Sequence, residues 1–233
     1  MSEKDRFVPK TDMEQIKGGE MIPKSLIFDW DGVLADTLWV LEEIYAKMSA
    51  HFGVPNPPHG KDHFDVDWKH HWTALGFADR LDEVQAFYLR EIKAYEGKTK
   101  LFPGVAAMLD ELAKHVKIAM VTNNYAENID PILEENNVHM HFAFIHDAHH
   151  PCTKPDPHII TLTAERLGVS PADMIFVGDM DKELVMAKQA GVGKVIGCAY
   201  GYHSEKRLAP TNPDKIVYSP QELRTVLQEA LHG

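Results

Sequence analysis

Short, almost continuously apolar runs recur along the chain, and they constrain its fold more than any other feature. Each run is rich in Ile, Val and Phe and lacks the apolar–polar alternation of a strand with one face in water. Such runs predict strands that are buried on both faces of a parallel sheet. They lie at residues 25–30, 117–122, 142–147, 173–179 and 194–200, with a weaker run at 215–219.

Helical stretches lie between these runs and after the last of them. They occupy residues 104–115, 126–137, 156–168, 182–191 and 219–231. Strand and helix in repeated order predict right-handed crossovers and an α/β fold with a doubly wound parallel sheet. Ligands of such folds bind at the carboxyl ends of the strands, so the residues that follow each run are the candidates for function.

One interval breaks this rhythm, because about eighty residues separate the first run from the second and a simple crossover needs far fewer. Apolar side chains recur at helical spacing at both ends of the interval, which predicts two amphipathic helices. These side chains are Leu38, Leu41, Tyr45, Met48 and Phe52, followed by Leu81, Val84, Tyr88, Ile92 and Tyr95. We therefore predict a polar leader at residues 1–20, an α/β core at 21–37 and 101–233, and an inserted helical cap at 38–100.

Charge and cysteine content narrow the class of protein. A formal net charge of -11 at pH 7, with no offsetting Lys/Arg block, argues against general binding to nucleic acid or anionic membranes. No apolar stretch is long enough to span a bilayer. The two cysteines have no metal-type spacing and suggest no disulfide framework, which fits a reducing cytosol. We expect a cytoplasmic protein, and the charge leaves its oligomeric state open.

Two acids flank Trp30 directly after the first run, in the stretch FDWDGVLADT. Asp29 and Asp31 are two residues apart on an extended chain, so their carboxylates point to the same side, and Gly32 lets the backbone turn sharply beneath them. Acids are depleted in strands and are rarely buried unpaired. The pair therefore predicts a functional site.

Three more acids follow the fourth run in VGDMDKEL, namely Asp179, Asp181 and Glu183. Crowded carboxylates raise each other's pKa unless a cation or water relieves them, which is typical of a metal site. Acids are also favoured in the first turn of any helix, where the helix dipole is positive. This stretch alone leaves both interpretations open.

Four motifs in order resemble those of the haloacid dehalogenase-like hydrolase superfamily, in its helical-cap group of phosphoglycolate phosphatase and β-phosphoglucomutase. Asp29 and Asp31 match its D-x-D motif, Thr122 in VTNN the second, Lys154 in KPDP the third and Asp179 the fourth. The resemblance covers roughly residues 21–233. It implies a Rossmann-like core with an α-helical cap inserted where this chain has its long interval.

The resemblance also implies a role for each matching residue. Asp29 would be the nucleophile that forms an aspartyl phosphate, and Asp31 the general acid and base. Thr122 and Lys154 would bind the transferring phosphoryl group, and Asn123, beside the threonine, could donate a hydrogen bond as well.

Magnesium accounts for the acids in this family, because Mg²⁺ prefers oxygen ligands and offsets their repulsion of phosphate. Asp29, Asp179 and the backbone carbonyl of Asp31 would hold it. Met180 and Glu183 stand where relatives commonly carry serine and aspartate. Glu183 is therefore predicted to lie in the second shell of the metal site, outside the direct ligands, although its longer side chain could also reach the ion directly or through water. Asp181 is predicted to face solvent at a helix start, and to replace Glu183 only if the loop turns differently.

Two histidine-containing segments leave alternatives open. Between residues 139 and 152, five histidines and Cys152 recur without the spacing of a zinc finger, which favours surface and loop histidines over a zinc site and predicts mild pH sensitivity. The five are His139, His141, His146, His149 and His150.

In the segment 63–77, Lys69, His70 and His71 offer a basic contact to a small anionic phosphoester, although a solvated helix face is the simpler interpretation.

The predicted function is a Mg²⁺-dependent phosphatase that hydrolyses a small phosphorylated metabolite, such as a phosphoglycolate-like compound or a sugar phosphate, through an aspartyl-phosphate intermediate. A β-phosphoglucomutase-like phosphotransferase is the main alternative, since it would share every core residue. A haloacid dehalogenase needs neither Asp31 nor magnesium, and a non-catalytic binding protein would not need to retain Asp29, Asp31, Thr122 and Lys154.

Overall fold

Six parallel strands form the sheet at the centre of the computed structural model, which describes residues 23–95 and 97–232. The strands are β1 (Ser25–Phe28), β4 (Lys117–Val121), β5 (Phe142–His146), β6 (Met174–Gly178), β7 (Lys194–Cys198) and β8 (Lys215–Val217). Their order in the sheet is β5-β4-β1-β6-β7-β8. Each falls within a predicted apolar run, which confirms the parallel α/β fold, whereas the predicted leader at residues 1–20 lies outside the described residues.

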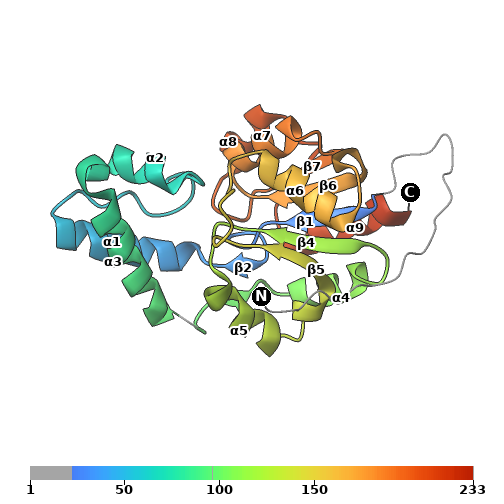
Figure 1. The fold of residues 1–233 in the computed structure, drawn as a ribbon, viewed down its shortest axis with the longest axis horizontal. Helices are drawn as coiled ribbons and strands as arrows, with labels where there is room; N and C mark the ends of the chain where they lie inside the picture. Colours follow the sequence, from blue (N-terminus) through green and yellow to red (C-terminus); the bar gives the residue numbers. More distant parts are fainter. Residues whose placement is uncertain (1–22, 96, 233) are drawn as a thin grey trace.

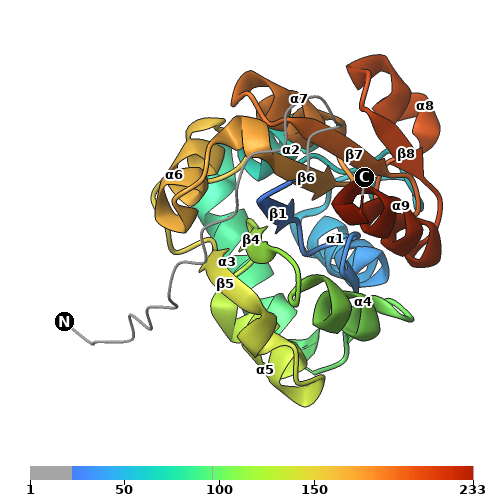
Figure 2. The same cartoon turned by 90° about the vertical axis from the view of Figure 1, so that its right-hand side faces the viewer.

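Helices cover both faces of the sheet (Figure 2). One face carries α4 (Val105–Leu112), α5 (Ala126–Glu135) and α9 (Pro220–His232). The other carries α6 (His158–Leu167) and α7 (Asp181–Gln189), followed by the short α8 (Glu205–Leu208). Isolated 3-10 turns lie at His139–His141, Pro171–Asp173 and Ala209–Thr211.

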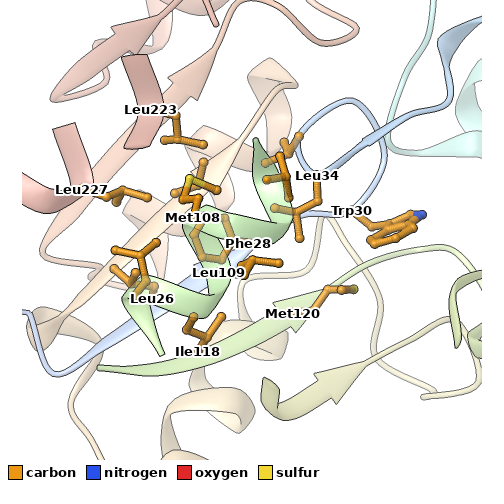
Figure 3. Packing of buried hydrophobic residues seen from close by; sticks show 14 of the residues in the cluster. Leu26, Phe28, Trp30, Leu34, Met108, Leu109, Ile118, Met120, Leu223 and Leu227 are labelled. Carbon is orange, nitrogen blue, oxygen red and sulfur yellow. The ribbon is translucent and has the colours of Figure 1, made fainter. Parts of the chain in front are cut away.

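Side chains of β1 alternate between two hydrophobic clusters. Leu26 and Phe28 pack with α4 and α9, through residues such as Leu109 and Leu227 (Figure 3). Ile27, between them, packs against α6 and α7 on the other face. Full burial of one such side chain stabilises the fold by about 1.5–3 kcal/mol. A strand that is buried on both faces leaves little place for polar side chains, which explains the almost continuous apolar runs.

The carboxyl end of β1 lies at the point where the order of the strands reverses. β4 pairs with one side of β1 and β6 with the other. Asp29 follows β1, Thr122 follows β4 and Asp179 follows β6. Because parallel strands end at the same edge, three segments that are far apart in the sequence meet at this switch point.

A helical insert (residues 38–100) leaves the sheet after β1 and lies to one side of it (Figure 1). It contains α1 (Leu38–Phe52), α2 (Trp68–Trp72) and α3 (Leu81–Ile92), with short turns at Thr73–Phe77, Ala78–Arg80 and Lys93–Tyr95. α1 ends at Phe52 and is capped by Gly53, whose φ of 70° favours glycine and which begins the predicted loop at 53–60. The insert has a hydrophobic cluster of its own, which includes Ile44, Met48 and Phe87.

A two-stranded antiparallel ribbon joins the helical insert to the sheet. Its strands are β2 (Ala35–Asp36) and β3 (Lys100–Leu101), at the two ends of the insert. The helices α1 and α3 match the sequence prediction, and α2 lies within the segment 63–77 that was interpreted as a helix face. The ribbon was not predicted, because its strands are too short to show a periodic pattern. Among the described residues, no helix combines the length and the apolarity that crossing a membrane requires.

Candidate active site

Three buried carboxylates converge at the carboxyl ends of β1 and β6. Asp29, Asp179 and Glu183 each place one carboxylate oxygen within 4.8 Å of the others. None of the three is more than 3% exposed. Glu183 lies in the first turn of α7, which directly follows β6, so the helix start brings it back beside the strand end. The structure therefore joins the two acidic motifs in one cluster.

Lys154 is the cation of this cluster. It is 4% exposed, and its Nζ donates to Asp29 Oδ1 at 2.5 Å and to Glu183 Oε1. Burial lowers the pKa of Lys154, but the attraction of Asp29 and then of Glu183 outweighs burial and raises its pKa above the usual value. One ammonium thus stands against three carboxylates, which leaves an excess of negative charge in the cluster.

The excess charge shows in the pKa values of the acids. Burial is the largest cause that raises the pKa of Asp29, of Asp179 and of Glu183, the last to about 7. Repulsion between the carboxylates adds to burial, and Lys154 offsets only part of both effects. The folded protein therefore disfavours full ionisation of this cluster unless a further cation is present.

Two oxygens of the cluster fit a metal ion. Asp179 Oδ1 and Glu183 Oε2 are buried and have no hydrogen-bond partner among the described residues. Buried carboxylate oxygens without partners are costly, and hard divalent cations prefer such oxygens as ligands. The donor set of Asp29, Asp179 and Glu183 is thus suited to a divalent cation.

Glycine is required beneath Asp179. Gly32 has a φ of 72°, and a Cβ at this position would lie 2.1 Å from Asp179 Oδ2. The same oxygen accepts a 2.6 Å hydrogen bond from the backbone N–H of Tyr202, in the loop after β7. The expected sharp turn after the D-x-D motif is present, and it lets the loop 199–204 close tightly around the acid.

Asp31 lies apart from the buried cluster but lines the same cavity. Asn124 Nδ2 lies 3.3 Å and 3.2 Å from its two carboxylate oxygens. Burial is the main cause that raises the pKa of Asp31, while hydrogen bonds from Thr37 and Asn124 lower it in part. A raised pKa favours the protonated form that a general acid needs.

The two asparagines after Thr122 have different tasks. Asn123 Nδ2 donates to the carbonyls of Val66 and Lys154, and Asn123 Oδ1 accepts from the N–H of Lys154, so its amide hydrogens are already used within the protein. Asn124, which the sequence analysis did not select, is the residue that contacts Asp31. No sequence pattern distinguishes an asparagine that bonds two backbone segments, as Asn123 does, from one that binds a substrate.

Thr122 is fully buried at the end of β4. Its hydroxyl oxygen accepts a 3.0 Å hydrogen bond from the N–H of Asn124, which leaves the hydroxyl hydrogen for another acceptor. The residues that line the cavity include Asn123 and Asn124 but not Thr122. Its predicted contact with a phosphoryl group stays a prediction.

Asp181 lies at the start of α7, as predicted, but it is a half-buried partner of Arg207 and not a freely solvated acid, and it does not replace Glu183. Its carboxylate accepts from Arg207 Nη2 at 2.7 Å and is 26% exposed. It is not part of the carboxylate cluster. The neighbouring His203 is fully buried, accepts from the N–H of Asp181 and donates to the carbonyl of Phe64. Packing of α8 against α7 brings Arg207 within hydrogen-bond reach of Asp181, and no local sequence pattern predicts that contact.

A segment of the helical insert, residues 61–66, is bonded directly to the sheet-bearing part of the protein. The Asp62 carboxylate accepts from the N–H and hydroxyl of Ser204 at 2.8 and 2.6 Å. Lys182 Nζ lies 2.6 Å from Asp65 Oδ2, and Lys61 Nζ donates to the carbonyl of Ala199. These contacts hold one wall of the insert against the loops that carry the acids.

A cavity of about 500 Å³ opens above the carboxylates and extends under the helical insert. The acids Asp29, Asp31, Asp179 and Glu183 line one end, together with Lys154. Of the three basic residues that offered a contact to an anionic substrate, only Lys69 lines the cavity. His70 is exposed and His71 is buried elsewhere, which agrees better with the simpler interpretation of this segment than with a basic contact.

The histidines between residues 139 and 152 belong to no metal site in the described part of the chain, since the one group of potential ligands found there is the carboxylate cluster. His139, His141 and His149 lie beside carboxylates of α4 and α5. His150 Nδ1 contacts the backbone of Cys152. The interpretation as loop and surface histidines is correct for most of them, and His146 is the exception.

His146 is buried at the end of β5 and is held neutral. The Thr163 hydroxyl donates to the carbonyl of Ile159, so it accepts from His146 Nδ1, and Nε2 is left buried without a partner among the described residues. Burial, and then the nearby His150, lower the pKa of His146 to about 4, while Asp147 raises it slightly. Protonation would place a charged N–H where nothing accepts it.

This arrangement predicts acid-sensitive stability. The pKa of His146 is lower in the folded state, so its stabilising effect is complete above pH 6.5 and is lost as the pH falls toward about 4. We expect a loss of up to about 3 kcal/mol in the free energy of unfolding over that range. Measured by urea unfolding, the free energy of unfolding of His146→Phe should fall less steeply with decreasing pH than that of the wild type. His139→Gln, which changes an exposed histidine, should match the wild type. Equal pH dependence for all three proteins would contradict the role assigned to His146.

Fold and site together define a class: a doubly wound α/β protein with an aspartate-bearing switch point beneath a helical insert. The model of the haloacid dehalogenase-like hydrolase family matches residues 26–197. The chain belongs to this family, as the four motifs predicted, and the family's name describes hydrolases.

Curated relatives of this chain are named as phosphatases. Phosphoglycolate phosphatase 1 of Pseudomonas aeruginosa is 27% identical over 229 residues, which cover 90% of this chain and 81% of the relative. N-acetylmuramic acid 6-phosphate phosphatase of Pseudomonas putida is 28% identical and covers 90% of this chain and 98% of the relative. Among solved structures, a proposed β-phosphoglucomutase from Thermotoga maritima superposes with a TM-score of 0.64 at 25% identity, over 88% of this chain and 99% of its own.

Proposed function

We propose that this protein is a Mg²⁺-dependent phosphatase that hydrolyses a small phosphorylated metabolite through an aspartyl-phosphate intermediate. The observation that carries the proposal is the cluster of Asp29, Asp179 and Glu183 around Lys154 at the bottom of a cavity. Family membership and the phosphatase names of the relatives support it.

Asp29 is the proposed nucleophile. One carboxylate oxygen is tied to Lys154 Nζ and to the N–H of Trp30, which fixes the orientation of the side chain. Attack on phosphorus would form a bond from Asp29 to the phosphoryl group and release the alcohol, and water would then hydrolyse the aspartyl phosphate. Lys154 offsets negative charge at the nucleophile and near the transferring oxygens.

Asp31 is the proposed acid and base. In the first step its carboxyl donates a proton to the leaving alcohol, and in the second it takes a proton from the attacking water. Asn124 holds this carboxylate by its two oxygens, and Thr37, which lines the cavity, is linked at 2.9 Å to the hydroxyl of Tyr202. We propose Asn124 as a positioning residue of Asp31. Asn123 was predicted to donate a hydrogen bond to the phosphoryl group, whereas Asn124 contacts the carboxylate of Asp31.

Asp29, Asp179 and Glu183 would hold the magnesium ion, together with the backbone carbonyl of Asp31 that the family pattern suggests. When bound, Mg²⁺ supplies positive charge for the phosphate and offsets the repulsion among the acids. Because Glu183 carries an unpartnered buried oxygen within the cluster, we propose that it acts on the metal directly.

The helical insert is proposed to be a cap domain (residues 38–100) on a core of residues 21–37 and 101–233. It carries its own hydrophobic cluster and joins the core through the β2–β3 ribbon. Such a cap would exclude water from the first step and reopen for exchange of product.

A panel of phosphomonoesters, assayed for phosphate release with and without MgCl₂, tests the proposed function. We expect release from at least one compound in the presence of magnesium and none in EDTA. Release of halide from haloacids without metal, or binding of phosphoesters with no turnover at all, would contradict the proposal.

Magnesium should also stabilise the folded protein in the absence of any substrate. It relieves repulsion among three buried carboxylates, so at a hundred times its Kd we expect a gain of about 2.7 kcal/mol in the free energy of unfolding. Differential scanning fluorimetry should show a rise in Tm with MgCl₂ for the wild type and a smaller rise for Glu183→Gln. Asp181→Asn, whose side chain pairs with Arg207, serves as the matched control and should respond like the wild type.

A phosphotransferase that returns the phosphoryl group to a sugar would use the same residues. The structural likeness to the proposed β-phosphoglucomutase is the observation in its favour. Product analysis distinguishes the two: a phosphatase releases inorganic phosphate from a hexose phosphate, whereas a phosphotransferase forms an isomeric hexose phosphate.

A further inference from the structure

The cavity under the helical insert is larger than a compound the size of phosphoglycolate requires. At about 500 Å³ it lies within the range of roughly 300–1,000 Å³ that is typical of pockets for drug-sized ligands. A compound as small as phosphoglycolate would fill only the end that holds the acids. Side chains of the insert form much of the remaining lining, so the alcohol part of the substrate would contact them.

Aromatic side chains form much of that wall. They are Tyr45, Phe64, Trp68, Trp72 and Tyr88, all from the helical insert. Their rings are close together, with centroids 4.5 Å apart for Trp68 and Trp72, 5.9 Å for Trp72 and Tyr88, and 5.3 Å for Tyr45 and Phe64. Trp72 Nε1 donates to the Tyr45 hydroxyl at 2.7 Å, so the protein itself satisfies the polar atom of this indole.

Aliphatic side chains extend this wall, namely Val40, Leu41, Val66, Leu89 and Ile92. Polar side chains of the insert, Gln85 and Thr99 among them, line the same cavity and offer hydrogen-bond partners to part of a polyhydroxylated substrate. A hydroxyl set against the aromatic and aliphatic side chains would lose water without gaining a partner, which costs free energy. An uncharged ring with apolar faces incurs no such cost and gains by burial and by stacking.

Charge on the insert's wall offers no net attraction for a second anionic group on the substrate. Among the described residues of the insert, Lys69 is the one cation in the lining, and its Nζ lies over the Trp68 ring at 5.3 Å. Asp65 and Asp67 line the same cavity; Asp65 pairs with Lys182 at 2.6 Å, and Asp67 accepts a hydrogen bond from the N–H of His70. With Asp65 neutralised by Lys182, the charges of Asp67 and Lys69 balance, so a carboxylate held under the insert would meet no net positive charge.

We propose that the physiological substrate is a phosphomonoester whose alcohol carries an uncharged aromatic ring, and that this ring packs against the aromatic wall of the insert. The inference rests on the proposed phosphatase function and narrows its substrate class. The phosphate would lie at the carboxylates and the ring against the side chains of α2 and α3, within one cavity.

Matched alkyl phosphates test the proposal, because their leaving alcohols have similar chemistry. We expect kcat/KM for 2-phenylethyl phosphate to exceed that for ethyl phosphate by at least about tenfold. Phosphoglycolate and glucose 6-phosphate, as probes with a carboxylate and with a polyhydroxylated ring, should also fall below 2-phenylethyl phosphate. Equal or better hydrolysis of any of the three would overturn the proposal while leaving the phosphatase function intact.

Two leucines of α3 provide a matched pair of variants. Leu89 lines the cavity, whereas Leu81 packs on the insert's hydrophobic cluster and is not part of the lining. Leu89→Ala should reduce the preference for 2-phenylethyl over ethyl phosphate by at least about threefold, and Leu81→Ala should keep the wild-type ratio. The ratio is internal to each variant, so a loss of active protein does not change it. An unchanged ratio in Leu89→Ala would count against the ring site.

Equilibrium binding separates the two proposals if turnover fails. Titration of the Asp29→Asn variant in MgCl₂, followed by tryptophan fluorescence, should give a Kd for 2-phenylethyl phosphate at least about tenfold below that for ethyl phosphate. If the protein bound 2-phenylethyl phosphate more tightly than ethyl phosphate but the wild type hydrolysed neither, the result would support the ring site and contradict the phosphatase function. If the wild type hydrolysed both compounds and the two Kd values were equal, the result would support the phosphatase function and contradict the ring site.

Discussion

Asp29→Asn should lower phosphate release by at least about a thousandfold, because the amide cannot take up the phosphoryl group. The fold should survive the change. Burial raises the pKa of Asp29, which means that the folded state disfavours its charge, so the neutral asparagine should leave Tm unchanged or raise it. Steady-state kinetics on a responsive substrate, with Tm measured on the same samples, check both parts.

Asp36→Asn is the matched control for this variant. Asp36 is exposed on the β2–β3 ribbon and is not among the residues that line the cavity. It makes the same chemical change close to the same loop and should keep wild-type activity. If Asp29→Asn retained more than a few per cent of the wild-type rate, the aspartyl phosphate would have to be abandoned.

Lys154→Met should be the most destabilising single change at the site. The Lys154 ammonium contacts Asp29 and Glu183, and its loss leaves their carboxylates buried beside Asp179 with no cation. Removing one partner of a buried ion pair typically costs about 3–5 kcal/mol. We expect a loss of this size in the free energy of unfolding, measured by urea denaturation in EDTA, and a smaller loss in MgCl₂. Activity should fall below detection.

Lys182→Met provides the comparison. Lys182 also pairs with a carboxylate, Asp65, but its side chain is 38% exposed. An exposed pair contributes about 0–1 kcal/mol, so this variant should stay near wild-type stability. The double variant Lys154→Met/Glu183→Gln should be less destabilised than the sum of the single changes, since it removes charges of both signs. Equal stability of Lys154→Met and Lys182→Met would show that the buried cluster is not under electrostatic strain.

The sequence predicted the sheet well because the signal is local. A strand buried on both faces favours apolar residues at almost every position, as in β1 and β6, and the apolar runs also located the less buried β5 and β8 at the edges of the sheet. It also predicted α1 and α3 through their helical periodicity. The β2–β3 ribbon was missed, because two residues per strand cannot show a period.

The acids of the site were predicted for a related reason. Asp29, Asp31 and Asp179 each follow a strand, and parallel strands bring their carboxyl ends to one edge. Roles within the site were harder to assign. Asn123 and Asn124 are adjacent, but after the turn that follows β4, Asn123 bonds the backbone of Val66 and Lys154 and Asn124 contacts Asp31. The conformation of that turn decides which asparagine reaches Asp31, and two identical residue types do not specify it.

By itself, the sequence determined the order of strands and helices, the long insertion and the positions of the acids relative to strand ends, because each depends on neighbours along the chain. The tertiary structure alone decided that Glu183 joins the carboxylate cluster, that Asp181 pairs with Arg207, and that the insert presents an aromatic wall rather than a basic one. Each of these is a contact between distant segments, and its partner is set by how the helices pack on the sheet and on each other.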